Sequence, residues 1–342
     1  MVPFKGCISG LLLAWAALAV APQLHASVLF EEDAPLEISL TGPMGTLVEE
    51  KEERIEMPFT LSTGGREVGV LIRSRGKSRM RVCDFPQLRM NFDGATTAGT
   101  PFEGQDKLKM VVRCRKGDRD GQDVLEEYAV YRIFALLSDV SYRVRLVHIT
   151  INDTDDRIFR GFRQGYGFLI EPLEQIASRV GGTVPEIPAV ALKWLDDGQV
   201  ALVYVFQYLV ANTDWSFVAP DGEEFCCHNV SLVDIGRKLF AVPYDFDLTG
   251  LVNARYAYPD PSLHIKRVTQ RVYRGFCTDD AVLRDAIEKV ASKREAVMDV
   301  MKSLPLESGK AVADRIDYLQ KFFEEAGDVD RILAKFEKGC HP

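Results

Sequence analysis

Four polar side chains in the segment 212–250 are the residues of this chain best suited to chemistry. They are Asp214, Asn229, Asp245 and Asp247. Carboxylates brought together in a low-dielectric site repel one another, and a divalent cation or a proton relieves that repulsion. An aspartate and an asparagine amide supply the hard oxygen ligands that magnesium takes when phosphates complete its shell. The set therefore predicts a magnesium site that works on phosphate groups.

The elements around these residues are predicted to present them together. A strongly apolar helix covers QVALVYVFQYLVAN, residues 199–212, and is expected to be buried nearly all round. Two strand-like stretches follow, VSLVDI and KLFAVPYDFD, joined by a tight turn at Gly236–Arg237. Loops after helices and the ends of strands are the places where a fold presents carboxylates to a cleft.

Each of these residues also has a purely structural interpretation. Asp214 is suited to capping the next segment, and Asn229 to a turn. Carboxylates such as Asp245 and Asp247 are common where a strand leaves a sheet. The order of all four, after a buried helix and with Pro243 before the last pair, favours a functional role over that alternative.

The order of an Asp, an Asn and another Asp resembles the phosphoryl-transfer layout of protein kinases. More closely, the run Pro243–Tyr244–Asp245–Phe246–Asp247 resembles the kinase-like family of spore coat protein H. Members of that family carry an Asp, then an Asn, then a Pro-(Trp/Tyr)-Asp-(Phe/Tyr)-Asp run. The resemblance covers residues 70–250. It departs from ordinary protein kinases in having no Gly-rich loop of the usual spacing, no His-Arg before Asp214, and an Asp in place of Gly after Phe246.

This resemblance implies an α+β, atypical protein-kinase-like fold with two lobes. A β-rich N-terminal lobe with one helix would cover residues 27–172, and a mainly helical C-terminal lobe carrying the Asp/Asn/Asp site would cover 173–342. The sequence patterns agree with that division. Short alternating stretches fill residues 28–115, and helical periodicity dominates from residue 279 onward.

Between those regions, a helix and two strands are predicted from their own patterns. The helix is DVLEEYAVYRIFALLSDVS, with Asp123 as its N-cap. The strands are RVRLVHITIND and GYGFLIE, the second at residues 165–171, and we expect them to pair in antiparallel fashion.

The resemblance implies a role for each residue of the site. Asp214 would be the general base toward the acceptor hydroxyl. Asn229 and Asp245 would hold the magnesium or manganese ion that bridges the phosphates of ATP. Asp247 would be a second metal ligand or a helix cap.

The resemblance also implies a set of cofactor-binding residues. Glu127 would lie on the helix of the N-terminal lobe, and Glu171 at the strand that leads to the hinge. A basic side chain must offset the charge that develops on the phosphates, and Arg89, Lys107 and Lys109 are the candidates. Arg89 is favoured by its place after the Phe-Pro sequence, although lysine is the usual phosphate partner in kinases.

Three functions follow from these residues. The first is an exported kinase-like enzyme that transfers phosphate from ATP to a hydroxyl, on a protein substrate. The second is a catalytically inactive relative that serves as an envelope or coat interaction protein. The missing Gly-rich loop, the Arg in place of Lys and the long insertion between Asp214 and Asn229 favour this alternative. The third is a metal-dependent phosphoester hydrolase that uses the same carboxylates.

The first 26 residues have the three zones of a cleaved signal peptide, which predicts a periplasmic or secreted protein. Lys5 is the basic zone, an apolar run extends from Ile8 to Ala21, and Ala26 is the small residue at the cleavage site. The run falls short of the ~20 apolar residues that a bilayer core needs, so stable membrane insertion is not expected. Loss of Lys5 changes the net charge from −8 to −9, and such an acidic protein is a poor partner for nucleic acid.

The remaining six cysteines form an even set, which predicts disulfides in an exported protein. Cys83 and Cys114 lie in two strand-like stretches, RMRVCDFPQLRMNF and LKMVVRCRK, that are expected to pair as neighbours, and they are the best single bridge. The adjacent Cys226 and Cys227 are not expected to bond each other, and either is free to reach Cys277 or Cys340. A zinc site is the less favoured alternative, because the chain has no CxxC motif and only scattered histidines.

Overall fold

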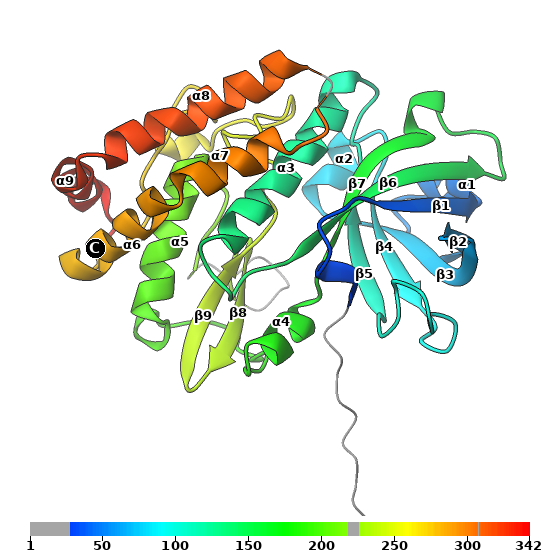
Figure 1. Cartoon of the computed structure of the whole chain (residues 1–342), viewed down its shortest axis with the longest axis horizontal. Helices are drawn as coiled ribbons and strands as arrows, with labels where there is room; N and C mark the ends of the chain where they lie inside the picture. Colours follow the sequence, from blue (N-terminus) through cyan, green and yellow to red (C-terminus); the bar gives the residue numbers. More distant parts are fainter. Residues whose placement is uncertain (1–27, 218–225, 307) are drawn as a thin grey trace, which may run out of the picture.

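A closed β-barrel lies beside a layer of helices and a small hairpin in the computed structural model (Figure 1), which describes residues 28–217, 226–306 and 308–342. The predicted signal peptide, residues 1–26, lies outside the described residues. The chain is of mixed α and β type, as expected. The sequence patterns did not predict that the first sheet closes on itself.

The barrel strands follow one another around the sheet in the order β1, β2, β3, β4, β5, β7, β6. Neighbours are antiparallel except β1 and β6, which are parallel and close the barrel. The bounds are β1 (Leu36–Gly42), β2 (Met57–Thr63), β3 (Arg66–Arg75), β4 (Gln87–Phe92), β5 (Lys107–Val111), β6 (Val144–Asp153) and β7 (Gln164–Ile170).

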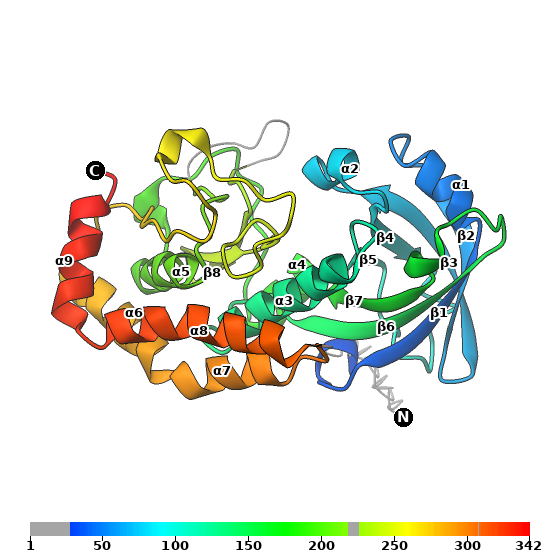
Figure 2. The same cartoon turned by 90° about the horizontal axis from the view of Figure 1, so that it is seen from above.

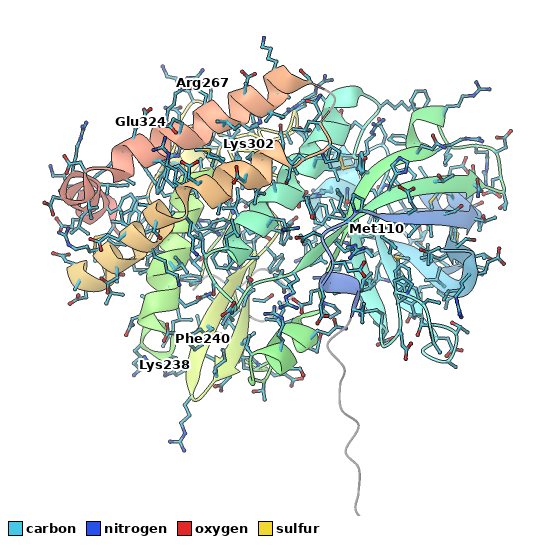
Figure 3. All side chains as sticks on the ribbon, in the orientation of Figure 1. Met110, Lys238, Phe240, Arg267, Lys302 and Glu324 are labelled. Carbon is cyan, nitrogen blue, oxygen red and sulfur yellow. A yellow bond between two sulfur atoms is a disulfide. The ribbon has the colours of Figure 1, made fainter. Side chains whose placement is uncertain are left out.

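The barrel encloses its own apolar core. Along β3, for example, Val68, Val70 and Ile72 are buried and the residues between them are exposed, which is the two-residue period of a strand with one buried face. Met110 on β5 is fully buried in this core, whereas Lys302 and Glu324 lie on exposed helix surfaces (Figure 3). The predicted antiparallel pairing of residues 144–153 with 165–171 is confirmed by β6 and β7.

One predicted strand is a helix instead. Residues Ser78–Val82 form α2, a short helix between β3 and β4. The rest of that stretch is extended, and β4 pairs with β5 as expected for neighbours. The alternation of apolar and basic side chains in RMRV suggested a strand, but five residues carry too little periodicity to distinguish the two structures.

The remaining helices pack beside the barrel and around the β8–β9 hairpin. Their bounds are α1 (Met44–Glu49), α3 (Asp118–Ala135), α4 (Leu173–Arg179), α5 (Asp197–Val210), α6 (Asp280–Ser292), α7 (Arg294–Lys302), α8 (Gly309–Ala326) and α9 (Val329–Gly339), and the hairpin strands are β8 (Val230–Ile235) and β9 (Lys238–Pro243). Helix α3 begins at Asp118, five residues before the predicted cap. It runs between the barrel and the helices α7 and α8 (Figure 2).

Helix α5 is buried on every side, as its uninterrupted apolar sequence predicted. All twelve residues from Gln199 to Val210 are buried. The helix begins at Asp196, whose side chain accepts a hydrogen bond from the amide of Gln199 at 2.9 Å, an N-cap of the usual kind. It packs against α6 and the β9 strand and belongs to the second apolar core of the molecule.

Three disulfides are present among the described residues. Cys83 is joined to Cys114, and Cys277 to Cys340. The third joins the neighbours Cys226 and Cys227, so the expectation that these two do not bond each other is wrong. Disulfides form and persist in oxidising compartments, and the three pairs indicate such an environment. Within the described part of the chain, no helix has both the length and the apolarity needed to cross a membrane.

An ion-pair network anchors the start of α3. Arg119 contacts Asp123 at 2.9 Å and Glu126 at 2.9 Å, and Arg315 on α8 contacts Glu126 at 2.8 Å. Both carboxylates are buried, and burial raises the pKa of Asp123 to about 7 in spite of Arg119.

This raised pKa predicts a pH-dependent contribution to stability. Below pH ~4 the Asp123 carboxyl is protonated in both states, and between pH ~4 and ~7 the folded chain holds a proton that the unfolded chain releases. The stability that the protonated Asp123 carboxyl gives the folded chain is therefore lost as the pH rises through about 7. We expect the unfolding free energy of Asp123→Asn to fall less than that of the wild type between pH 4.5 and 8, measured by urea unfolding. Asp285→Asn, a change of an exposed residue on α6, is the control, and an unchanged pH slope in Asp123→Asn would contradict the assignment.

Candidate functional site

The turn after α5 places Asp214 in a fixed conformation. Ala211 ends the helix in the left-handed region with φ 50°, and the side-chain oxygen of Asn212 accepts a hydrogen bond from the amide of Asp214 at 2.9 Å. The indole of Trp215 donates to the Asn212 carbonyl at 3.1 Å. Arg274 donates to the carbonyls of Thr213 and Trp215. The side chains of Asn212, Trp215 and Arg274 thus hold the loop by hydrogen bonds to its backbone.

The Asp214 carboxylate has two side-chain partners. His228 Nε2 lies 2.8 Å from Oδ1, and the Asn229 amide donates to Oδ2 at 3.0 Å and to the Asp214 carbonyl at 2.8 Å. The carboxylate remains accessible, with 39% of its side chain exposed. Because the Asn229 nitrogen is used in this way, its side-chain oxygen remains as an acceptor for another group.

The β8–β9 hairpin brings Asn229 to Asp245. Gly236 and Arg237 both have positive φ, 62° and 75°, as a tight two-residue hairpin turn requires. The register then sets Val230 opposite Pro243, and the amide of Tyr244 donates to the Asn229 carbonyl at 3.0 Å. Asn229 and Tyr244, 15 positions apart in sequence, are thereby placed next to each other, and Asp245 follows Tyr244 directly.

Phe246 fixes the direction of the two carboxylates beside it. Its ring is fully buried and packs edge-on against Tyr131 of α3 at 4.7 Å and Phe206 of α5 at 5.5 Å. Asp245 has φ 61°, and its amide donates to the Tyr131 hydroxyl at 2.9 Å. With Phe246 as an anchor, Asp245 and Asp247 both face the space next to α3.

Arg79 of helix α2 joins three carboxylates in this space. Its guanidinium contacts Glu127 at 2.7 Å, Asp245 at 2.8 Å and Asp247 at 2.8 Å. Arg79, Glu127 and Asp247 are almost completely buried, whereas 42% of the Asp245 side chain is exposed. We call these four residues the Arg79 cluster. It connects α2, α3 and the segment after β9.

Burial dominates the electrostatics of the cluster. Desolvation raises the pKa of Glu127 to about 7 and also raises the pKa of Asp247, and Arg79 opposes both shifts. Burial would lower the pKa of Arg79, but Asp247 and Glu127 raise it well above the ordinary value. The Tyr256 hydroxyl is bonded to Asp247 and completes the shell. The buried, always charged arginine favours the ionised form of these carboxylates and limits the rise of their pKa values.

The carboxylates of the cluster fit a divalent cation in part. Ligand oxygens of Glu127, Asp245 and Asp247 lie within 4.8 Å of one another, and hard oxygens are what magnesium and manganese take. Arg79 engages all three of these carboxylates. Asp245, with 42% of its side chain exposed, is the one with a side open to an ion, and Asp247 is adjacent to it.

The other residues expected to bind the cofactor make contacts outside the Arg79 cluster. Arg89 is on β4, opposite Arg73 and Lys109 on the neighbouring strands. Lys107 is exposed and pairs with Asp106 at 3.3 Å. Glu171 is buried in a bond with Arg179 at 2.9 Å. Lys109 is the candidate that comes near the site, with its ammonium 5.4 Å from the centre of the Tyr244 ring.

Two contributors to the site had little sequence signal. Arg79 lies in the stretch that was interpreted as a strand, and its partners are 48 and 166 residues away. His228 is a contact of Asp214 that the sequence patterns do not single out. The adjacency of His228 to Asn229 was the available signal, and a lone histidine is not enough to use it.

A pocket of about 160 Å³ is lined by Val230 and Tyr244, the residues that follow Asn229 and precede Asp245 in the sequence. Apolar side chains reach it from three places: Leu173 of α4, the segment with Val184 and Ile187, and Val230 and Leu232 of β8. Its surface is polar as well, with Ser231 of β8 among the lining residues. Tyr244 and the Cys226–Cys227 disulfide complete it. Helix α4 and β8 lie side by side in Figure 1. The pocket thus shares Tyr244 and Val230 with the chain segments that carry the polar site.

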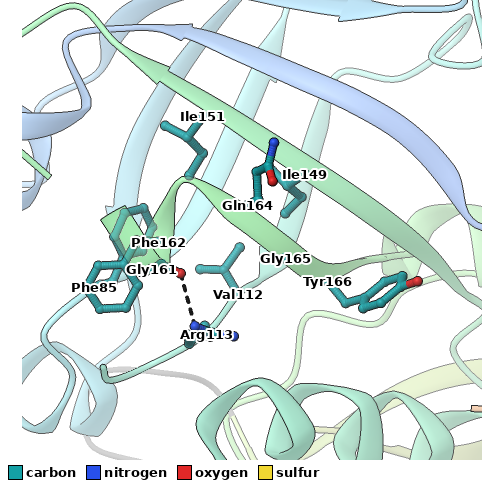
Figure 4. A pocket seen from close by; sticks show the side chains of 10 residues that line it. All are labelled: Phe85, Val112, Arg113, Ile149, Ile151, Gly161, Phe162, Gln164, Gly165 and Tyr166. Atoms are coloured by element: carbon teal, nitrogen blue, oxygen red, sulfur yellow. Dashed lines mark hydrogen bonds between the residues drawn. The ribbon is translucent and has the colours of Figure 1, made fainter. Parts of the chain in front are cut away.

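A second, smaller pocket lies in the barrel wall (Figure 4) and is not suited to such a ligand. Its volume is about 20 Å³, enough for one water. It is lined mainly by Phe85, Val112, Ile149 and Ile151, and Arg113 closes one side by donating to the Gly161 carbonyl at 3.0 Å.

Neither a protein-family model nor a curated protein matches this chain. Among solved structures, the chain is similar to the proinflammatory kinase CtkA of Helicobacter pylori. The two share 10% sequence identity with a TM-score of 0.36, over 74% of this chain and 93% of that chain. Similarity at this level carries no argument about activity, which therefore has to come from the geometry of the site.

Proposed function

We propose that this protein transfers a phosphoryl group from ATP to a hydroxyl of a protein substrate, with magnesium or manganese. The observation that supports the proposal concerns Asp214, Asn229 and Asp245. The Asn229 amide donates to Asp214, and the Asn229 carbonyl accepts from the amide of Tyr244, the residue before Asp245. A base, an amide oxygen and an exposed carboxylate at one place are the parts that phosphoryl transfer needs.

Each residue has a distinct task in this proposal. Asp214 accepts the proton of the acceptor hydroxyl, and its bonds to His228 and Asn229 hold the carboxylate in position. Asn229 and Asp245 would hold the metal ion, with Asp247 beside them. The ion, when bound, neutralises charge on the phosphates. Arg79 keeps Asp245 and Asp247 oriented through its two bonds to them.

The adjacent pocket favours a nucleotide over a simple phosphoester. The pocket offers Leu173, Leu232 and the Tyr244 side chain to a ring, and Val230 and Tyr244 connect it along the chain to Asn229 and Asp245. Ligand pockets typically combine an apolar body with a few convergent polar groups. The Lys109 ammonium lies 5.4 Å from the centre of the Tyr244 ring, which lines the pocket, and would supply a cation to such a ligand.

The metal assignment is tested with Asp245→Ala. We expect wild-type protein to bind Mn²⁺ in the presence of ATP, detected by the loss of the free-ion electron paramagnetic resonance signal, and Asp245→Ala to weaken binding at least about tenfold. Asp234→Ala, a half-buried residue near the turn of the same hairpin, is the matched control. Equal Mn²⁺ binding by wild type and Asp245→Ala would show that the site assignment is wrong.

A second function is supported by one specific observation. Arg79 contacts all three carboxylates that could ligate a metal. Ion pairs of this kind would hold the fold of a protein that has lost its metal. In that case the chain is a catalytically inactive envelope or coat interaction protein. Incubation with labelled ATP and Mn²⁺ separates the two: reproducible self-labelling or substrate labelling that Asp214→Ala abolishes excludes the inactive protein.

Export completes the proposal. The three disulfides support a location outside the cytoplasm, and residues 1–26 supply the predicted signal peptide. The acceptor would then be a secreted or envelope protein.

A further inference from the structure

The Cys226–Cys227 disulfide forms part of the wall of the 160 Å³ pocket beside the polar site. Cys227 is almost completely buried, and Cys226 is half-buried. Successive side chains of an extended segment point to opposite sides, but the bond between these two holds both sulfur atoms at one place. Leu173, Val184 and Ile187 also line this pocket. The disulfide therefore supplies a fixed, polarizable apolar surface to whatever ring the pocket holds.

The bond also maintains an uncommon backbone next to Asn229. Cys227 has φ 129° and Asn229 has φ 53°. Residues other than glycine rarely adopt such backbone angles. His228 lies between them, fixed to Ser216 by two backbone hydrogen bonds of 3.0 Å. The disulfide and the proposed metal ligand are thus two residues apart on a segment with constrained geometry. Release of the bond would let Cys227 leave its conformation and move this segment.

We infer that the Cys226–Cys227 bond is a redox-controlled wall of the nucleotide pocket: the oxidised chain binds the ligand, and reduction weakens binding. This inference rests on the proposed function and names a regulation of the same site. The reductant is a dithiol. One of its thiolates attacks a sulfur of the bond and forms a mixed disulfide, and its second thiolate then displaces that cysteine. The dithiol is oxidised to its own disulfide, and two electrons and two protons pass to Cys226 and Cys227.

The test measures two ligands by isothermal titration calorimetry. Adenosine probes the apolar pocket without any metal, and ATP with Mg²⁺ probes the pocket and the polar site together. The proteins are the oxidised wild type and Cys226→Ser/Cys227→Ser, which reproduces the chain without the bond. Cys277→Ser/Cys340→Ser is the matched control, because it removes a disulfide near the C-terminus, between the segment before α6 and the end of α9.

We expect both ligands to bind oxidised wild type and the control alike, and to bind Cys226→Ser/Cys227→Ser at least about tenfold more weakly. Wild type treated with dithiothreitol should match the double variant, with the state of residues 226 and 227 read by mass spectrometry of the alkylated peptide. Circular dichroism confirms that each variant is folded.

The outcomes distinguish this inference from the proposed function. Equal affinities for Mg²⁺–ATP with and without the bond would overturn the redox inference and leave the proposed function standing. If adenosine binding depends on the bond, but Mg²⁺–ATP binds the oxidised chain no more tightly than adenosine does, the redox wall would be supported and phosphoryl transfer from ATP overturned. Binding of neither ligand to the oxidised chain would overturn both.

Discussion

Replacing Arg79 with alanine is expected to destabilise the protein by about 3–5 kcal/mol, the cost of breaking a buried ion pair by removing one partner. Arg79 is the guanidinium that contacts Glu127, Asp245 and Asp247 together. Without it, two carboxylates stay buried with no partner of opposite charge at bonding distance. A loss of this size is a large fraction of the 5–15 kcal/mol that typically stabilises a domain.

The loss should depend on pH with a definite sign. In the folded wild type the pKa of Glu127 is raised to about 7, above its value in the unfolded chain. Its contribution to stability is therefore complete at low pH and lost as the pH rises through about 7. Loss of Arg79 raises the pKa of Glu127 and Asp247 further, because the charged forms lose their partner. Protonation then relieves the buried charge in acid, so the difference between wild type and Arg79→Ala should be smaller at pH 5.5 than at pH 8.5.

Urea unfolding followed by circular dichroism at those two pH values measures both effects. The matched control is Arg81→Ala, two residues along α2 and exposed, which should change stability by less than about 0.5 kcal/mol. A loss in Arg79→Ala that is below about 1 kcal/mol, or equal at the two pH values, would contradict the role given to this arginine.

The contrast between Arg79 and Asp245 explains how much of the site was predictable. Asp245 lies in a local pattern: an alternating strand, a Pro and two carboxylates around a Phe, all within ten residues. Local patterns fix hairpin register, so the neighbourhood of Asn229 and Asp245 followed from the sequence. Arg79 acts through contacts with residues far away in the chain. A single charged residue gives no periodic signal for burial, and Arg89 was favoured for its local context alone.

The disulfides show the same limit of prediction from local sequence. Cys83 and Cys114 follow from two strands that were expected to be neighbours, and the structure joins them. The Cys226–Cys227 bond depends on a backbone that residues other than glycine rarely adopt, with φ 129° at Cys227. Two adjacent cysteines in a sequence do not predict that conformation. Closure of the barrel by parallel pairing of β1 with β6 likewise depends on contacts far apart in the sequence. The two-residue period of buried side chains within one strand does not predict it.

Replacement of Asp214 by asparagine is expected to slow phosphoryl transfer by about 10²–10⁴-fold, the usual contribution of a general base. The variant keeps the shape of the side chain; its one oxygen can accept from the Asn229 amide, and its amide nitrogen then lies toward His228. It loses the ability to take the proton of the acceptor hydroxyl. Because 39% of this side chain is exposed, we expect a stability change of less than about 1 kcal/mol.

The measurement is the initial rate of labelling with radioactive ATP and Mn²⁺, together with the affinity for ATP. An interaction used only in the transition state lowers the rate and leaves ground-state binding unchanged. The affinity of Asp214→Asn should therefore stay within about threefold of wild type. Asp197→Asn, at the exposed start of the same helix α5, is the control for a lost carboxylate and should label at the wild-type rate.

The split between rate and affinity decides what Asp214 does. A slow variant with normal affinity identifies Asp214 as the base, because the metal ligands and the pocket are then intact. A variant that loses affinity as strongly as rate would show that Asp214 instead positions Asn229 through their hydrogen bond, and the base would have to be another group. Labelling at the wild-type rate in Asp214→Asn would contradict both roles, and with them the reason for placing the acceptor hydroxyl at the end of α5.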